Sequence, residues 1–377
     1  MGIRPEYLTE ADEIPDFWIS TGEEIDGLLS RIVKKGEVGV IGTSAGGRPI
    51  KAVFYGTPRQ GSGTTTFSGS LGYRNVRAYL GPDYEKKVAL IFAGVHGSEL
   101  EGIVGLANLI AVLETGADLA GRSRPRLTEA AGRIDRLIII PIVNVDGRAR
   151  LPIRKEAYRG TDNSVHRYIN CGCWQNGQPI GWPGCKEFIP LDFTKTEFPG
   201  CYPNDAGVNI QHDDFLGHPQ PETRALLDLV AKERPDLTIN MHTGAPPKNF
   251  YMRMHRPFME PALTAAFDGL YRQVHNGLTL AGLQSTGDVE LEATPPAPTN
   301  TSPYNLDTVL NLHCGALTAL IEAPCHGFSG TNRAGQVVKH TPKDLLDAQL
   351  VTYQECLLYL AETGGRHRWA GGAQTKK

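Results

Sequence analysis

The chain has 377 residues, of which 40% are apolar, and this is enough to bury a large α/β core. Its 38 basic and 41 acidic residues leave a formal net charge of −3, which favours neither nucleic acid nor an anionic membrane as a partner. The N-terminus lacks the apolar segment of a secretory signal, and the longest apolar runs are only strand-length. We therefore expect no membrane span and a cytoplasmic location, or a secreted protein if a signal was removed.

Hydrophobic periodicity predicts strands and helices that alternate along most of the chain. In order, the sequence predicts a helix at 22–35, strands at 37–41, 50–55 and 87–93, a helix at 99–113, a strand at 136–143, a helix at 221–233, a strand at 237–241, a helix at 259–277, a strand at 316–322 and a helix at 343–360. Near-continuous apolar strands between helices are typical of a sheet covered on both faces. We therefore predict a three-layer α/β/α fold, in which ligands bind at the carboxyl ends of the strands.

The periodicity is interrupted by an irregular segment at about 156–206. This segment is rich in glycine, proline and cysteine, and its aromatic residues supply enough apolar area to predict an ordered excursion. Four of the seven cysteines fall within it, at Cys171, Cys173, Cys185 and Cys201. They are consistent with reduced thiols, a pair of disulfides or a structural metal site, although their spacing is not a standard ligand pattern. A second, proline-rich loop is expected at 293–303.

Potential metal ligands follow two of the predicted strands. His96 and Glu99 come directly after the strand at 87–93, and His242 follows the strand at 237–241. Two imidazoles and a carboxylate suit Zn²⁺ and leave the open fourth position of a catalytic site. The alternative for the first pair is that His96 caps the next helix and Glu99 lies in its first turn.

A carboxylate also ends the strand at 316–322. Glu322 follows a mostly apolar run, and burying an acid there costs several kcal/mol unless it is paired or hydrated. A buried salt bridge would explain a single glutamate of this kind. Beside a metal site, a catalytic acid/base is the better interpretation.

Taken in chain order, these segments resemble the M14 family of zinc metallocarboxypeptidases. The matching segments are 42–50, 94–99, 141–147, 241–244 and 321–322. The resemblance implies a single catalytic domain over 1–377 and an α/β/α sandwich with a mixed, mostly parallel eight-stranded sheet. It further implies one Zn²⁺ per chain, bound by His96, Glu99 and His242, with Glu322 as general acid/base.

The resemblance is less complete where relatives bind the substrate. Arg154 matches an arginine that polarises the scissile carbonyl, and Tyr304 is a candidate for a mobile tyrosine. Gln211 and His212 stand where the family has the Asn-Arg pair that binds the substrate's terminal carboxylate. The arginines that could replace this pair are Arg159, Arg167, Arg253 and Arg256.

The sequence therefore predicts a zinc-dependent hydrolase of a peptide or small amide bond. The changed residues at 211 and 212 leave open an amidase or deacylase that acts on a small N-acyl or cell-wall-type substrate. A homologue that binds metal or peptide without catalysis is a further alternative. A serine esterase is disfavoured, because no Gly-x-Ser-x-Gly elbow is visible: the one such sequence, at 42–46, lies in a predicted hairpin connection between two strands and not at a strand-to-helix turn.

Overall fold

The computed structural model describes residues 3–244, 248–285 and 304–370, and the loop expected at 293–303 lies outside them. Its main sheet has the strand order β1-β2-β4-β3-β7-β9-β8. The four central strands β4, β3, β7 and β9 are mutually parallel, whereas β1, β2 and β4 pair antiparallel, as do β8 and β9. The predicted α/β class with a mixed sheet is confirmed. In the described part of the chain this sheet has seven strands, where the resemblance implies eight.

The elements have the following bounds. The main sheet consists of β1 (Glu37–Thr43), β2 (Pro49–Gly56), β3 (Val88–Ala93), β4 (Arg136–Ile140), β7 (Leu237–Thr243), β8 (Arg253–His255) and β9 (Leu317–Ala323). Two small ribbons consist of β5 (Cys173–Trp174) with β6 (Thr196–Phe198), and of β10 (Gly330–Thr331) with β11 (Val337–Val338). The α-helices are α1 (Gly22–Ile32), α2 (Phe67–Tyr73), α3 (Val76–Leu80), α4 (Leu100–Thr115), α5 (Pro125–Gly132), α6 (Val145–Ala149), α7 (Ser164–Cys171), α8 (Pro221–Glu233), α9 (Thr264–Leu280), α11 (Leu306–Cys314), α12 (Pro342–Thr363) and α13 (Arg366–Trp369). Short 3₁₀ turns occur at Pro5–Tyr7, Gly184–Lys186, Phe193–Lys195, Ile210–His212 and Pro261–Leu263.

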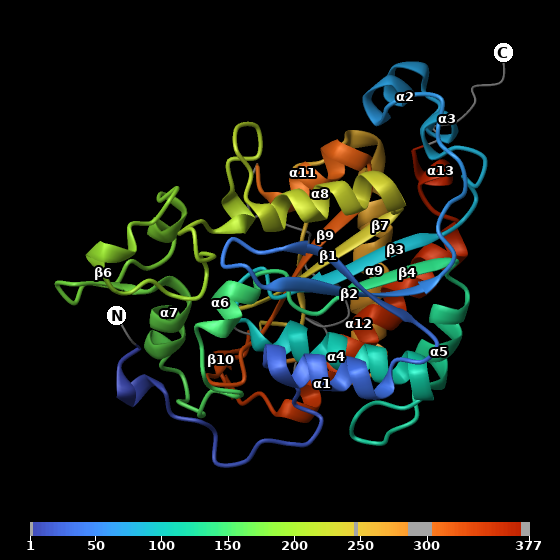
Figure 1. Cartoon of the computed structure of the whole chain (residues 1–377). Helices are drawn as coiled ribbons and strands as arrows, with labels where there is room; N and C mark the ends of the chain where they lie inside the picture. Colours follow the sequence, from blue (N-terminus) through green and yellow to red (C-terminus); the bar gives the residue numbers. More distant parts are fainter. Residues whose placement is uncertain (1–2, 245–247, 286–303, 371–377) are drawn as a thin grey trace.

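The sheet is the middle layer of three (Figure 1). Helices α8 and α11 cover one face, where they share a core with alternate residues of β2, β3 and β4. Helices α4, α9 and α12 cover the other face, and α1 and α5 complete this larger core. Strands β3 and β7 are buried along their whole length, which explains the continuous apolar sequence of β3. Among the described residues, no helix is long and apolar enough to cross a membrane.

Local signals set the ends of the outer helices. Helix α1 begins with a capping box, in which the Thr21 side chain and the Glu24 side chain each bind the other's backbone N–H. Helix α12 begins with Thr341 as N-cap and Pro342 in its first turn, and it ends at Gly364 in the left-handed conformation. These residues explain why both helices were predicted from sequence to within a few residues of their observed ends.

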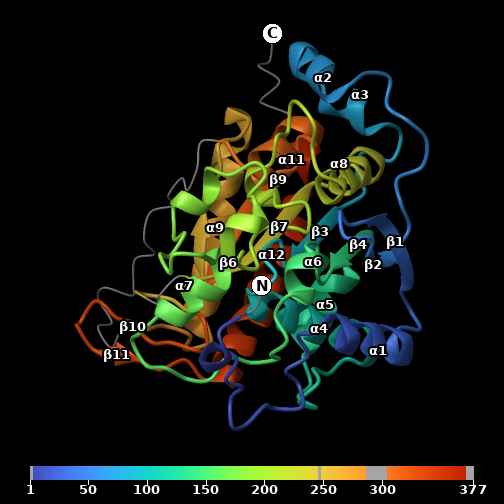
Figure 2. The same ribbon diagram turned by 60° about the vertical axis from the view of Figure 1, so that its left-hand side comes forward.

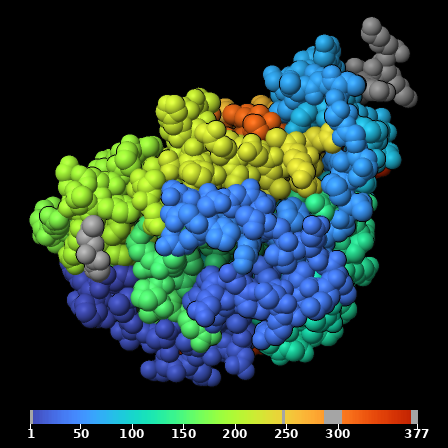
Figure 3. Space-filling view, viewed as in Figure 1, coloured from blue at the N-terminus to red at the C-terminus, as the bar shows by residue number. Residues whose placement is uncertain are grey.

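The irregular segment at 156–206 contains α7, β5 and β6 and lies at the opposite side of the molecule from α2 and α3 (Figures 1 and 2). In the space-filling view the two regions project from the body on opposite sides (Figure 3). All seven cysteines are thiols in the structure. The thiols of Cys171 and Cys185 are hydrogen-bonded to each other, whereas the thiol of Cys173 donates to the carbonyl of Gln178.

A buried ion pair between Arg59 and Asp236 lies at the amino-terminal end of β7. The guanidinium of Arg59 donates to Asp236 at 2.7 Å, and both side chains are fully buried. The same carboxylate accepts the backbone N–H groups of Val88 and Arg366. It therefore neutralises a buried cation and joins three separate segments.

We expect Asp236→Asn to destabilise the protein by about 3–5 kcal/mol, because Arg59 would remain charged and buried without a counter-ion. The midpoint of urea unfolding, at an unchanged slope, measures this loss. The control is Asp26→Asn, which removes a solvent-exposed partner of Lys51 and should cost less than about 1 kcal/mol. Equal, small losses in the two variants would contradict the assigned role of Asp236.

Candidate metal centre

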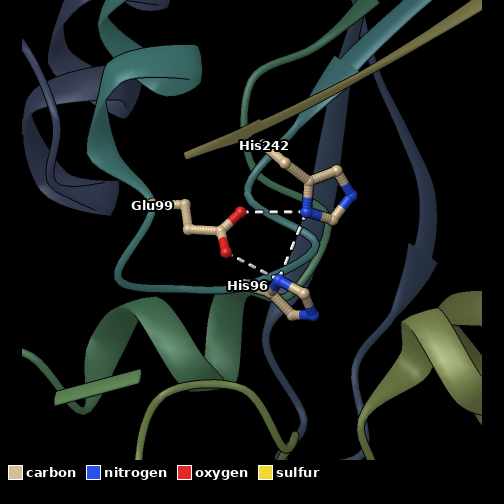
Figure 4. A group of neighbouring side chains, drawn as sticks. All are labelled: His96, Glu99 and His242. Atoms are coloured by element: carbon tan, nitrogen blue, oxygen red, sulfur yellow. Dashed lines mark hydrogen bonds and ion pairs between the residues drawn. The ribbon is translucent and has the colours of Figure 1, made fainter. Parts of the chain in front are cut away.

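The carboxyl ends of β3 and β7 bring His96, Glu99 and His242 together. The Nδ1 atom of His96 lies 2.8 Å from Glu99 Oε1, and the Nδ1 atom of His242 lies 2.9 Å from Glu99 Oε2. The two Nδ1 atoms are 3.2 Å apart, and the three side chains point toward one another (Figure 4). All three are buried, at no more than 4% exposure. The structure therefore places one nitrogen from each ring and one carboxylate around a common point.

The loop that carries His96 is held by close backbone packing. A Cβ atom at Gly97 would lie 2.1 Å from the backbone N of Arg148, so only glycine allows this loop to approach α6. Hydrogen bonds fix the start of α6. The Asp146 carboxylate accepts hydrogen bonds from Ser44, Gly46 and Arg48. The segment 144–147 thus supports the loop that carries His96.

The charges at the centre attract a cation. Burial alone would raise the pKa of Glu99, but the charges of His96 and His242 hold it below its usual range. Burial lowers the pKa of His242, yet the Glu99 carboxylate outweighs burial and raises this pKa to about 9. Glu99 is therefore ionised, and a divalent cation can take the place of the proton that it shares with His242.

Surrounding groups orient the three ligands for a metal. The outer nitrogen of His96, Nε2, donates to the Asn209 side chain at 3.1 Å, which leaves the lone pair on Nδ1 facing Glu99 and His242. Thr243 donates its backbone N–H to Glu99 Oε2 at 3.0 Å. The ring of Tyr202 stacks on His96 with centroids 3.6 Å apart. This donor set and its orientation fit zinc.

The sequence analysis did not identify Asn209 or Tyr202 as parts of the site, although Asn209 lies only two residues before Gln211. Nothing in the sequence indicates that Tyr202, from the irregular segment, covers a metal ligand.

Glu322 lies beside the three ligands. In the parallel pairing of β7 with β9, His242 and Glu322 are directly opposite each other. In the antiparallel pairing of β9 with β8, Arg253 is opposite Glu322. Burial raises the pKa of Glu322 to about 7, and the negative charge of Glu99 contributes to this rise. A candidate histidine ligand, a carboxylate and a guanidinium therefore follow one another across three adjacent strands.

The remaining predicted residues have other contacts. Arg154 forms an ion pair with Glu24 of α1 at 2.5 Å, so its role toward a substrate stays a prediction. Gln211 donates from its side chain to the buried carboxylate of Asp307 at 2.8 Å. The aromatic ring of Tyr304 meets the edge of Phe215, with centroids 6.2 Å apart.

His212 is half-buried and its ring faces Trp182. Burial lowers the pKa of His212 to about 3, and the positive charge of Lys186 acts in the same direction. His212 is therefore neutral near pH 7, unlike the arginine that the family has at this place.

The fold and the site together define a metallohydrolase of the α/β class. The family model for zinc carboxypeptidases, Peptidase M14, matches residues 24–256, and the chain belongs to this family. It is therefore a zinc metallopeptidase. A search of curated proteins found no match.

Solved metallocarboxypeptidases share the fold at low sequence identity. The metallo-carboxypeptidase of Burkholderia cenocepacia is 15% identical, with a TM-score of 0.54 over 90% of this chain and 69% of that one. Carboxypeptidase A of Helicoverpa armigera is also 15% identical, with a TM-score of 0.51 over 96% of this chain and 76% of that one. The metallo-carboxypeptidase of Pseudomonas aeruginosa, solved with (2-guanidinoethylmercapto)succinic acid, is 16% identical, with a TM-score of 0.50 over 90% of this chain and 68% of that one.

Proposed function

We propose that this metallopeptidase hydrolyses a peptide or amide bond with Glu322 as the general acid/base. The observation that supports this most directly is the position of Glu322 opposite His242, at the edge of the sheet where the three ligands meet. Held by His96, Glu99 and His242, zinc would supply a Lewis acid that polarises the substrate carbonyl and makes water more acidic.

The chain's own groups then perform the proton transfers. The Glu322 carboxylate accepts the proton of the attacking water and returns it to the leaving nitrogen as the amide bond breaks. The β7–β9 pairing fixes the backbone of Glu322 relative to His242, so the acid/base keeps a constant position beside the metal ligands. Arg154 could act on the carbonyl only if Glu24 released it, because the two side chains form an ion pair.

Arg253 is the arginine that the structure favours for binding a substrate carboxylate. Directly opposite residues of an antiparallel pair place their side chains on the same face, so Arg253 shares a face with Glu322. Two of the other candidates have different partners: Arg256 faces Asp268 at 3.6 Å, and Arg159 donates to the backbone of Glu6. We therefore propose a carboxypeptidase-like activity in which Arg253 performs the task that His212 cannot.

The second candidate is an amidase or deacylase on a substrate without a free terminal carboxylate. The neutral state of His212 favours it, because no charged group then stands at the family's usual position. The two functions predict different effects of Arg253 on kcat/KM: it matters for substrates with a free carboxylate in the first and not in the second.

We expect Arg253→Ala to lower kcat/KM for N-acylated peptides with a free C-terminal carboxylate by roughly 10- to 150-fold. A hydrogen bond to a charged group is worth about 1.5–3 kcal/mol, and 1.4 kcal/mol corresponds to a factor of ten. The same peptides with an amidated C-terminus should lose little. Arg256→Ala is the matched control, because it removes a guanidinium three residues along the chain. Faster cleavage of amidated peptides by the unmodified protein, unaffected by Arg253→Ala, would support the deacylase instead.

A further inference from the structure

A second group of buried potential ligands lies outside the catalytic centre. Glu156, His166 and Cys325 come from three segments: the chain before α7, α7 itself and the loop after β9. One potential ligand atom from each lies within 4.8 Å of the others. The three residues offer oxygen, nitrogen and sulfur, a combination that suits borderline-soft divalent ions.

The Glu156 carboxylate lies between the other two groups. Its Oε1 atom is 3.4 Å from His166 Nδ1, and its Oε2 atom is 3.3 Å from the sulfur of Cys325. An ion pair and a thiol hydrogen bond would account for these two contacts without a metal. The surroundings of the histidine and of the sulfur provide two further observations.

The outer nitrogen of His166, like that of His96, contacts an asparagine side chain. His166 Nε2 lies 3.1 Å from the amide nitrogen of Asn170, which donates to it, whereas His96 Nε2 lies 3.1 Å from the amide oxygen of Asn209 and donates to that oxygen. In both cases Nδ1 faces the ligand group, and an outer partner on the second nitrogen is typical of metal-binding histidines. Turning the Asn170 amide by 180° lets its oxygen accept from Nε2, and the hydroxyl of Ser98, which also bonds this amide, suits either orientation.

The sulfur of Cys325 receives a backbone hydrogen bond. Gly327 donates its N–H to Cys325 Sγ at 3.3 Å, and such a bond favours the thiolate, which is the form that binds metals. Burial and the charge of Glu156 raise the pKa of the Cys325 thiol, so the thiolate forms when a cation binds. A Cβ atom at Gly327 would lie 2.5 Å from Glu156 Oε2, so glycine lets the carboxylate approach. His340 donates from Nδ1 to the carbonyl of Cys325 at 2.7 Å and fixes the loop.

We infer that Glu156, His166 and Cys325 form a second cation site, for a thiophilic divalent ion such as Zn²⁺. On binding, the thiol of Cys325 and the His166 ring, whose pKa the Glu156 charge raises against the effect of burial, each release a proton to solvent. They then coordinate as thiolate and neutral imidazole, and Glu156 coordinates as the carboxylate. One divalent ion, one thiolate and one carboxylate sum to zero charge, as a buried site requires. The ion would join α7 to the loop that begins two residues after Glu322, so its role is structural.

Metal counting on the full chain tests this site independently of any activity. We expect the metal-free protein to bind two equivalents of Co²⁺, and the bound form to show the near-ultraviolet charge-transfer band of a thiolate–Co²⁺ bond. Cys325→Ser should lose the band and one equivalent. His242→Ala should lose the other equivalent and keep the band, because the catalytic centre has no sulfur ligand.

Controls separate this site from other cysteines and from misfolding. Cys314→Ser is the matched control, since Cys314 is also buried and its thiol donates to a backbone carbonyl. Glu156→Gln, which keeps the size of the side chain, should weaken the second equivalent if Cys325→Ser does not fold. Saturation of the unmodified protein at one equivalent without the band would overturn the inference. So would a band that survives Cys325→Ser and disappears when Cys171 or Cys185 is replaced.

Discussion

Replacing Glu322 by glutamine is expected to lower kcat by about 10²–10⁴-fold while zinc content and fold stay unchanged. Glutamine keeps the shape of the side chain but cannot accept a proton. Glu322 lies opposite His242 in the β7–β9 pairing and does not belong to the ligand group, so the metal should remain. Turnover at saturating substrate, measured together with zinc content, tests this expectation.

A matched control is Glu222→Gln, another buried glutamate, which accepts hydrogen bonds from Ala45 and Asn204 in the outer part of the fold. It should change stability more than kcat. Near-normal turnover in a zinc-loaded Glu322→Gln protein would remove this residue from the mechanism, even if the metal assignment stood.

The second large effect is expected on zinc affinity in His242→Ala. This change removes one of the three candidate ligands, the ring whose nitrogen lies 2.9 Å from Glu99 Oε2. Removing a hydrogen-bond partner of a metal ligand lowers metal affinity by roughly 10- to 100-fold, and removing the ligand itself should lower zinc affinity by more. Asn209→Ala removes such a partner from His96, so its smaller loss of zinc affinity is the reference for His242→Ala in the same protein.

Competition with a chelator measures both losses. The titration is best performed in the Cys325→Ser background, so that only the catalytic centre is counted. Unchanged zinc affinity in His242→Ala would show that other residues hold the catalytic metal.

The parts of the fold that could be predicted are those with long apolar patterns. Strands β3, β7 and β9 and helices α4, α8 and α12 are long enough for their periodicity to exceed chance, and the candidate ligands lie directly after the end of β3 and within the end of β7. Helices α2 and α3 were missed because residues 57–82 are rich in glycine, serine and threonine. Helix α11 was missed although residues 306–314 are amphipathic.

The unpredicted parts of the site depend on long-range pairing. Strand β8 has only three residues, so no period identifies it, and the position of Arg253 opposite Glu322 is a property of the sheet register. The group of Glu156, His166 and Cys325 has no spacing motif, because Cys325 is 169 residues from Glu156. The ion pair of Arg154 with Glu24 likewise joins distant segments, and the sequence indicated only that Arg154 is basic.

The stacking of Tyr202 on His96 has a consequence for attempts to make a smaller enzyme. The irregular segment resembles an insertion that could be trimmed, yet it supplies this ring and also the Cys201 carbonyl that accepts the N–H of Gly97. Asn144, in the turn before α6, donates to the Tyr202 carbonyl as well. Excising the segment would therefore uncover a metal ligand and loosen the loop that carries it. Chimeras between this chain and other members of its family should therefore exchange the His96 loop and the Tyr202 segment together.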